Sequence, residues 1–162
     1  MTAPAAPAND GRPAAWPRRA RPVTTLMLAT DLGEASETAT KHAIALAAQL
    51  EARLLVVTVM DTRPRRGPLP RPVEERERLS EQVSAVAARA RDAGATTSFL
   101  VWDGEPVESI IAAAEAEAAD MIVVGSHRRS PMGRAILGSV SDRVVREATC
   151  PVLVVPPDRL EA

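Results

Sequence analysis

Short runs of apolar residues alternate along the chain with longer segments in which apolar residues recur every three or four positions. Runs of the first kind are typical of buried strands, and spacing of the second kind is typical of amphipathic helices. The runs predict five strands, over residues 26–29, 54–60, 96–102, 121–124 and 152–155. The positions expected to face the core are Ala39, Ala43, Leu46 and Leu50 in the first helix, Leu79, Val83, Val86, Ala90 and Ala93 in the second, Val107, Ile110, Ile111, Ala114 and Ala118 in the third, and Val140, Val144 and Val145 in the fourth.

The strict alternation of strands and helices predicts a doubly wound α/β fold. Strands that are apolar on both sides belong to a parallel sheet covered by helices on both faces, with right-handed crossovers. The third strand carries Thr97 and Ser98, and this polar content favours a place at the edge of the sheet. In such sheets, ligands bind beyond the carboxyl ends of the strands, at the point where the strand order reverses.

The length of 162 residues predicts one domain, which we place at residues 23–157. Residues 1–22 combine five prolines and four arginines with little apolar periodicity, so we expect a disordered tail. Residues 158–162 form a short C-terminal tail. No apolar segment follows the arginines, which argues against an export signal.

Composition excludes several classes of protein. The net charge is −1 and aromatic residues are 2% of the chain, so neither a basic surface nor stacking platforms for nucleic acid are expected. The apolar runs are strand-sized, too short for a membrane span. Cys150 is the only cysteine, which favours a reducing cytoplasm and a small buried side chain rather than a redox sensor.

The strand ends carry the candidate chemistry. Asp31 follows the first strand, where it either caps the next helix or faces a ligand. The loop after the fourth strand leads into a helix beginning near Gly138, Ser139 and Ser141, whose amides and hydroxyls form a candidate phosphate site. Ser139 and Asp142 also have the spacing of a capping box, so Ser139 could serve only to cap its helix instead of binding phosphate. The lysine of a P-loop and the G-x-G-x-x-G of a dinucleotide fold are both missing.

Five segments together resemble the universal stress protein family over about residues 23–157. They are ATDLGEASE at 29–37, GEP at 104–106, ADMIVVGSH at 119–127, LGSVS at 137–141 and CPVLVVP at 150–156. The resemblance implies a parallel sheet of strand order 3-2-1-4-5, similar to the adenine nucleotide alpha hydrolases, and a role in the stress response. It also implies a homodimer formed through the last strand, Cys150–Val155, whose unpaired edge needs cover.

The ATP-binding branch of that family carries G-x2-G-x9-G-[S/T]. Gly125, Gly138 and Ser139 fit this pattern, but Arg128 replaces the second glycine. If position 128 requires positive φ, arginine costs about 1 kcal/mol more than glycine. By resemblance, Asp31 contacts adenine, Val59 lines its pocket, Gly125 lies against ribose, and the full set of nucleotide-binding candidates is Thr30, Asp31, Val59, Gly125, His127, Arg128, Arg129, Gly138, Ser139, Val140 and Ser141. The implied ligand is ATP, with or without Mg²⁺.

Three hypotheses remain at this point. The first is a nucleotide-binding regulatory protein that is not an enzyme, since no catalytic dyad or metal cluster is apparent, although slow ATP hydrolysis stays open. The second is a universal stress protein that does not bind ATP and works through dimerisation and partner contacts, which Arg128 favours. The third is a phosphoacceptor receiver domain using Asp31, Asp103 and Ser126, but the lysine it needs after the fifth strand is missing.

Overall fold

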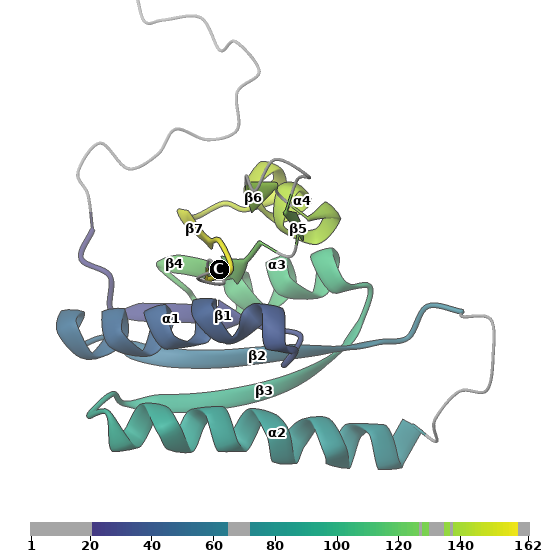
Figure 1. Ribbon diagram of the computed structural model, residues 1–162, viewed down its shortest axis with the longest axis horizontal. Coiled ribbons are helices and arrows are strands. Elements are labelled where there is room, and N and C mark those ends of the chain that lie inside the picture. The colour runs from purple at the N-terminus through teal and green to yellow at the C-terminus, as the bar shows by residue number, and fades with distance from the viewer. Residues whose placement is uncertain (1–20, 65–71, 127, 130–134, 137, 159–162) are drawn as a thin grey trace, which may run out of the picture.

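A five-stranded parallel sheet forms the centre of the protein, in the order β3-β2-β1-β4-β7 (Figure 1). The computed structural model describes residues 21–64, 72–126, 128–129, 135–136 and 138–158. The predicted fold and strand order are confirmed, and the third strand lies at an edge as expected. The elements are β1 (Thr25–Ala29), the 3-10 helix η1 (Glu34–Ser36), α1 (Glu37–Leu50), β2 (Arg53–Asp61), α2 (Pro72–Asp92), β3 (Thr97–Gly104), α3 (Pro106–Ala116), β4 (Met121–Gly125), β5 (Arg128–Arg129), β6 (Ala135–Ile136), α4 (Ser139–Glu147) and β7 (Val152–Val155).

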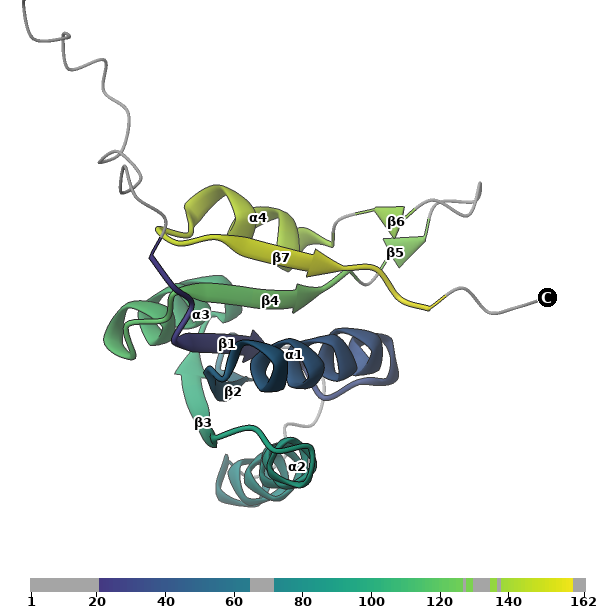
Figure 2. The ribbon, with the colours of Figure 1, turned by 90° about the vertical axis from the view of Figure 1, so that its left-hand side faces the viewer.

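Helices cover both faces of the sheet because successive strand residues point to opposite sides. In β1, Leu26 and Leu28 pack against α1 and α2, while Met27 and Ala29 pack against α3 and α4. Figures 1 and 2 show β7 with α4 at one edge of the sheet and β3 with α2 at the other. The fold therefore has three layers and two apolar cores.

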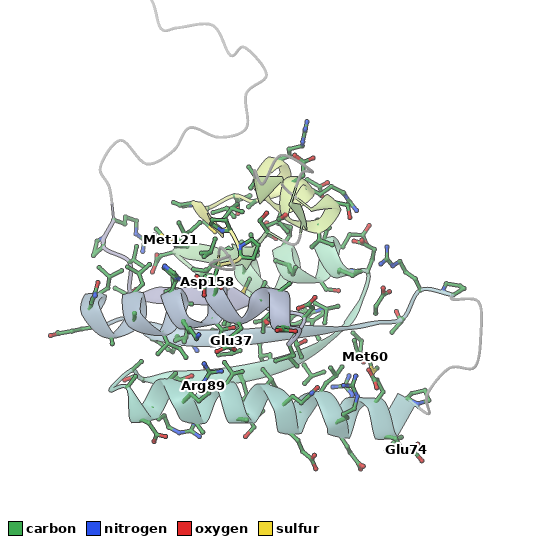
Figure 3. The ribbon with its side chains drawn as sticks, viewed as in Figure 1. Glu37, Met60, Glu74, Arg89, Met121 and Asp158 are labelled. Carbon is green, nitrogen blue, oxygen red and sulfur yellow. The ribbon has the colours of Figure 1, made fainter. Side chains whose placement is uncertain are left out.

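An ion pair joins the two helices that share one face of the sheet. Glu37 of α1 and Arg89 of α2 approach to 2.5 Å (Figure 3). The hydrogen bond from Arg89 lowers the pKa of Glu37. Both side chains are close to half exposed, so the pair adds at most about 1 kcal/mol to stability.

The predicted core positions are wrong near several helix ends. Leu50, Ala93 and Ala118 are exposed, because Leu50 ends α1 and the other two lie beyond the ends of their helices. Of the three core positions predicted in α4, only Val144 is buried, whereas Val140 and Val145 are 37% and 44% exposed. This helix lies at the edge of the sheet, so it buries only a narrow stripe.

The loop expected between Gly125 and Gly138 contains an unpredicted feature. Arg128 pairs with Ile136, and Arg129 with Ala135, in a short antiparallel ribbon formed by β5 and β6. Two-residue strands leave too little periodicity to be recognised in a sequence.

The remaining organisational predictions have mixed outcomes. Residues 1–20 of the expected disordered tail lie outside the described part of the chain. None of the described helices combines the length and the apolar character that membrane crossing requires. Cys150, predicted to be buried, is half-buried against the core formed with α3 and α4, and burial raises the pKa of its thiol.

Candidate functional site

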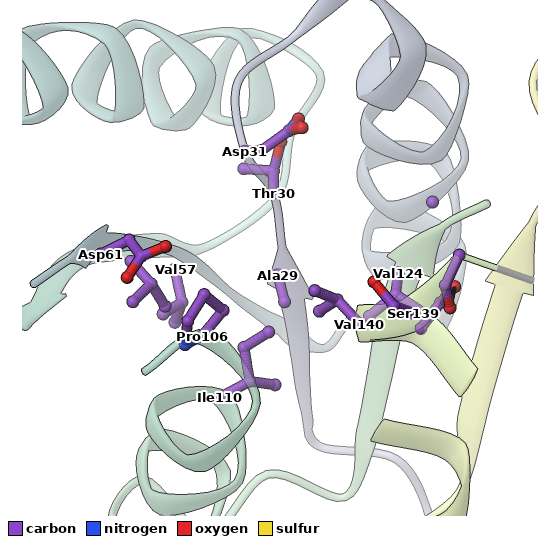
Figure 4. Close-up of a pocket in the computed structure, with 14 residues that line it drawn as sticks. Ala29, Thr30, Asp31, Val57, Asp61, Pro106, Ile110, Val124, Ser139 and Val140 are labelled. Carbon is purple, nitrogen blue, oxygen red and sulfur yellow. Dashed lines mark hydrogen bonds between the residues drawn. The ribbon is translucent and has the colours of Figure 1, made fainter. Parts of the chain in front are cut away.

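A cavity of about 310 Å³ opens at the carboxyl ends of β1 and β4. Ala29 pairs with Val124 across these neighbouring strands, so Asp31 and Gly125 follow at the same end of the sheet, as predicted. The volume is within the range of small-molecule sites. The cavity is lined by Ala29, Thr30, Asp31, Val57, Val59, Asp61, Pro106, Ile110, Val124, Gly125, Gly138, Ser139, Val140 and Ser141 (Figure 4).

Asp31 is held in place by its own loop. Its Oδ1 accepts hydrogen bonds from the backbone N–H of Gly33 at 2.9 Å and from the hydroxyl of Ser36 at 2.5 Å. Neither of these two bonds involves a backbone amide of α1, whose N-cap residue is Ser36. The carboxylate organises the turn and also forms part of the cavity wall.

The same loop contains a left-handed residue. Leu32 has φ +62°, a conformation that costs a branched side chain about 1 kcal/mol or more. Its N–H donates to the hydroxyl of Thr30, and its side chain packs against the core. At Gly33, an added Cβ would lie 3.2 Å from Oδ1 of Asp31, so glycine permits the close approach of this carboxylate. The loop therefore presents Asp31 in a fixed orientation.

The N-terminus of α4 forms the anion-binding candidate at the other side of the cavity. Gly138 is the N-cap residue, and it has no side chain that could accept from the first helical amides. Those amides lack acceptors within a helix and carry its positive dipole end, which is the arrangement that binds phosphate. The Ser141 hydroxyl donates to the Gly138 carbonyl at 3.1 Å.

The capping box suggested for Ser139 is not formed. Ser139 is the first residue of α4 instead of its N-cap, because the helix begins one residue earlier than that motif requires. Asp142 forms an ion pair with Arg146, with 3.0 Å between carboxylate and guanidinium. The exposed Ser139 thus stays at the mouth of the cavity rather than serving as a cap.

Apolar side chains form the middle of the cavity. Val57 and Val59 are two positions apart in β2 and reach the cavity from the same face of the strand. Val124 of β4 and Ile110 of α3 also line it. Sequence analysis identified only Val59 among these residues. Asp61 is two positions after Val59 in β2, so the period of two along a strand could have identified Asp61 as a further residue of the cavity wall.

The turn between β3 and α3 completes that wall. Gly104 has φ +140°, and an added Cβ would lie 2.7 Å from the hydroxyl oxygen of the buried Ser109, so the turn requires glycine. Glu105 then caps α3 by accepting the N–H of Glu108 at 2.9 Å, and Pro106 takes the first helical position. This local geometry places Pro106 against the cavity.

Eight of the predicted site residues line this one cavity, namely Thr30, Asp31, Val59, Gly125, Gly138, Ser139, Val140 and Ser141. Arg128 and Arg129 lie in β5, and His127 is outside the described residues. Non-glycine residues with positive φ in the described ranges are Leu32, Glu51 and Ala118. Arg128 is in a strand, so the backbone penalty considered for arginine at this position does not arise.

Other chemistry is poorly supported by this arrangement. Asp103, which a receiver domain would use beside Asp31, is paired with Arg76 of α2 and is not part of the cavity wall. Within the described ranges, no three His, Cys, Asp or Glu side chains gather as a metal site. The cavity therefore combines an apolar middle, two aspartates and a helix N-terminus, which suits a ligand with a flat base and an anionic group.

Comparison with known proteins points to one family. The universal stress protein family matches residues 22–156. A universal stress protein of Methanocaldococcus jannaschii is 33% identical over 143 residues, covering 84% of each chain, and one of Thermus aquaticus is 35% identical over 138 residues, covering 81% of this chain and 97% of its own.

Solved structures agree with the family match. A universal stress protein in complex with cAMP has a TM-score of 0.67 and 26% identity, covering 85% of this chain and all of its own. The structure of M. jannaschii MJ0577 has a TM-score of 0.69 and 27% identity, covering 86% of this chain and 99% of its own.

Proposed function

Since the chain belongs to the universal stress protein family, we propose that it is a regulatory protein that binds ATP or a closely related adenine nucleotide in the cavity beside Asp31. The observation that carries the proposal is the meeting of Asp31, Val59 and the N-terminus of α4 around one cavity. Support also comes from the 26% identical relative solved with cAMP.

Each part of the cavity has a partner in the nucleotide. The valines on β2 and β4 offer apolar faces to the base, and the amides at the start of α4 offer donors to the phosphates. Asp31 is oriented to accept a hydrogen bond from the base or sugar. Mg²⁺ would reach the protein through phosphate oxygens, since Mg²⁺ commonly retains waters and substrate ligands.

We further propose that the protein is not an efficient enzyme. Hydrolysis of a bound phosphate needs a group that positions or activates water. The carboxylate of Asp31 lines the base-binding part of the cavity and is occupied with Gly33 and Ser36. Binding, rather than turnover, is the function that these residues support.

Titration calorimetry with ATP tests this proposal. We expect wild-type protein to bind one ATP per chain, and Arg128→Gly to bind it within about threefold of the wild-type affinity, because the backbone at Arg128 is extended. A large loss in Arg128→Gly would instead make the arginine a phosphate ligand. Absence of binding by both proteins would leave the alternative, a universal stress protein that acts through partner contacts alone.

The edge of the sheet at β7 supports a homodimer as part of this proposal. Leu153 of β7 is 37% exposed, and Figure 2 shows β7 at an edge of the sheet with α4 beside it. An uncovered apolar edge strand is a surface that proteins usually pair or protect. Light scattering should give twice the chain mass of 17.2 kDa, and a particle of one chain mass at micromolar concentration would contradict the dimer.

A further inference from the structure

We infer that Asp61 selects the base of the nucleotide, favouring a purine with an amino group at position 6 over one with a carbonyl oxygen there. The inference rests on the proposed function and adds a specificity-determining residue to the same cavity. Asp61 is the last residue of β2 and lies two positions after Val59, so both side chains reach the cavity from one face of the strand.

The position of Asp61 relative to the N-terminus of α4 determines which part of a bound nucleotide faces its carboxylate. Figure 4 shows Asp61 and Pro106 at one side of the cavity and Ser139 and Val140 at the other, with Ala29 between them. A nucleotide with its phosphates at α4 has its base in the apolar middle. The edge of a purine farthest from the sugar carries position 6, and that edge then points toward Asp61.

Asp61 is held as an oriented carboxylate. Its Oδ1 accepts from the N–H and Nε of Arg63 at 3.0 and 2.9 Å, and its Oδ2 accepts from Nη2 at 2.7 Å. The Asp61 side chain is 10% exposed, whereas that of Arg63 is 54% exposed. Arg63 thus holds the carboxylate from the solvent side, while Asp61 itself forms the cavity wall.

A second acid fixes the arginine. Glu105, the N-cap residue of α3, lies 3.6 Å from Arg63 and 3.3 Å from Arg143 of α4. The hydrogen bonds with Asp61 raise the pKa of Arg63. This chain of charges ties the end of β2 to the two helices that border the cavity, so Asp61 is presented in a fixed place.

The negative charge of Asp61 distinguishes a base with a hydrogen-bond donor at position 6 from one with an acceptor there. An amino group at position 6 brings hydrogens toward the carboxylate, which attracts them, whereas a carbonyl oxygen brings a second acceptor against a largely desolvated negative group. Specificity of this kind arises as much from the repelled ligand as from the attracted one. ATP should therefore bind at least about tenfold more tightly than ITP.

The experiment compares ATP and ITP on three proteins. In Asp61→Asn the amide keeps the size of the side chain and adds a donor, so we expect the preference for ATP to fall to about threefold or less. Asp103→Asn is the matched control, because Asp103 is opposite Met60 on the neighbouring strand and also pairs with an arginine but lies outside the cavity wall. Its preference should equal that of the wild type.

The outcomes separate the two proposals. Equal loss of ATP and ITP binding in Asp61→Asn, with an unchanged ratio, would make Asp61 a structural residue and overturn the inference. Wild-type protein that binds ATP and ITP equally would overturn it as well, while leaving the proposed function standing. Wild-type protein that binds neither nucleotide would overturn both. Thermal midpoints of the variants confirm that each is folded.

Discussion

The two ends of the sheet use aspartate for different purposes. At the amino end, Asp120 accepts hydrogen bonds from the N–H and hydroxyl of Thr24, at 2.9 and 2.8 Å, and from the N–H of Thr25 at 3.0 Å. At the carboxyl end, Asp31 accepts hydrogen bonds from Gly33 and Ser36 of its own loop, and it lines the cavity. One carboxylate joins the starts of two strands, whereas the other lies in the wall of the cavity.

The difference follows from the geometry of a parallel sheet. At the amino end, β1 and β4 begin side by side, so a carboxylate before β4 meets the first amides of β1 and closes the edge. At the carboxyl end, the chain leaves β1 and β4 in separate loops, and a hollow remains between them. Substitutions at the amino end should therefore change stability, and those at the carboxyl end should change binding.

The largest expected effect is at Gly138. Its φ of −70° is open to any residue, so Gly138→Val changes the surface of the cavity more than the backbone. The branched side chain would block the approach of phosphate to the amides of α4, and we expect ATP affinity to fall by about a hundredfold or more, measured by calorimetry.

A matched control distinguishes this effect from loss of folding. Valine is a poor N-cap residue, so Gly138→Val should also lower the unfolding free energy by up to about 1 kcal/mol. Ala112→Val adds the same side chain to an exposed position in α3, where a comparable small destabilisation is expected without loss of ATP binding. Wild-type affinity in Gly138→Val would mean that phosphate does not bind at α4.

The next effect is on stability, at Asp120. Asp120→Ala removes the acceptor for three hydrogen bonds, including that of the part-buried Thr25 amide, and should lower the unfolding free energy by about 1–3 kcal/mol in urea titrations. ATP affinity should stay within about twofold of the wild type. A variant of wild-type stability would contradict the structural role of this residue.

Lowering the pH should weaken the stabilisation that Asp120 provides. Burial alone raises the pKa of Asp120, but the hydrogen bonds from Thr24 and Thr25 outweigh it and hold the pKa below the ordinary value of 3.8. A carboxyl group whose pKa is lower in the folded protein than in the unfolded chain stabilises the fold at pH values above the unfolded-state pKa. This stabilisation is lost as the pH falls through the folded-state pKa. The difference in unfolding free energy between wild type and Asp120→Ala should therefore shrink below pH 3.8.

The smallest expected effect is at Asp31. Asp31→Asn keeps an oxygen for the bonds from Gly33 and Ser36, so the loop and the thermal midpoint should change little. A hydrogen bond to a charged acceptor is about 1 kcal/mol stronger than one to a neutral acceptor, which predicts an affinity loss of about fivefold. An unchanged affinity for ATP would show that this carboxylate does not touch the nucleotide.

Much of the fold could be predicted because its signals are local. The continuous apolar runs of β2 and β4 and the helical spacing between them are visible within a few residues. The exposure of Val145 could not be predicted, because it depends on the place of α4 at the edge of the sheet. The strand order came from the resemblance to the family, and the structure confirms it.

The candidate site was predictable only where a motif marks it. Asp31 and Gly138 belong to motifs, and they line the cavity as expected. Asp61 and Pro106 meet only because β2 and β3 end in register, with Asp61 opposite Gly104. The two-residue period along β2 indicates that Asp61 shares a face with Val59, but the meeting of Asp61 with Pro106 depends on pairing between distant segments, which no short stretch of sequence reveals.

Native mass spectrometry of the purified protein after addition of ATP tests the central claim most directly. The account predicts one bound nucleotide per chain in the wild type and in Asp120→Ala, and none in Gly138→Val at the same ATP concentration. A wild-type protein that binds no nucleotide, or equal binding by the wild type and Gly138→Val, would contradict a nucleotide site at the carboxyl end of the sheet.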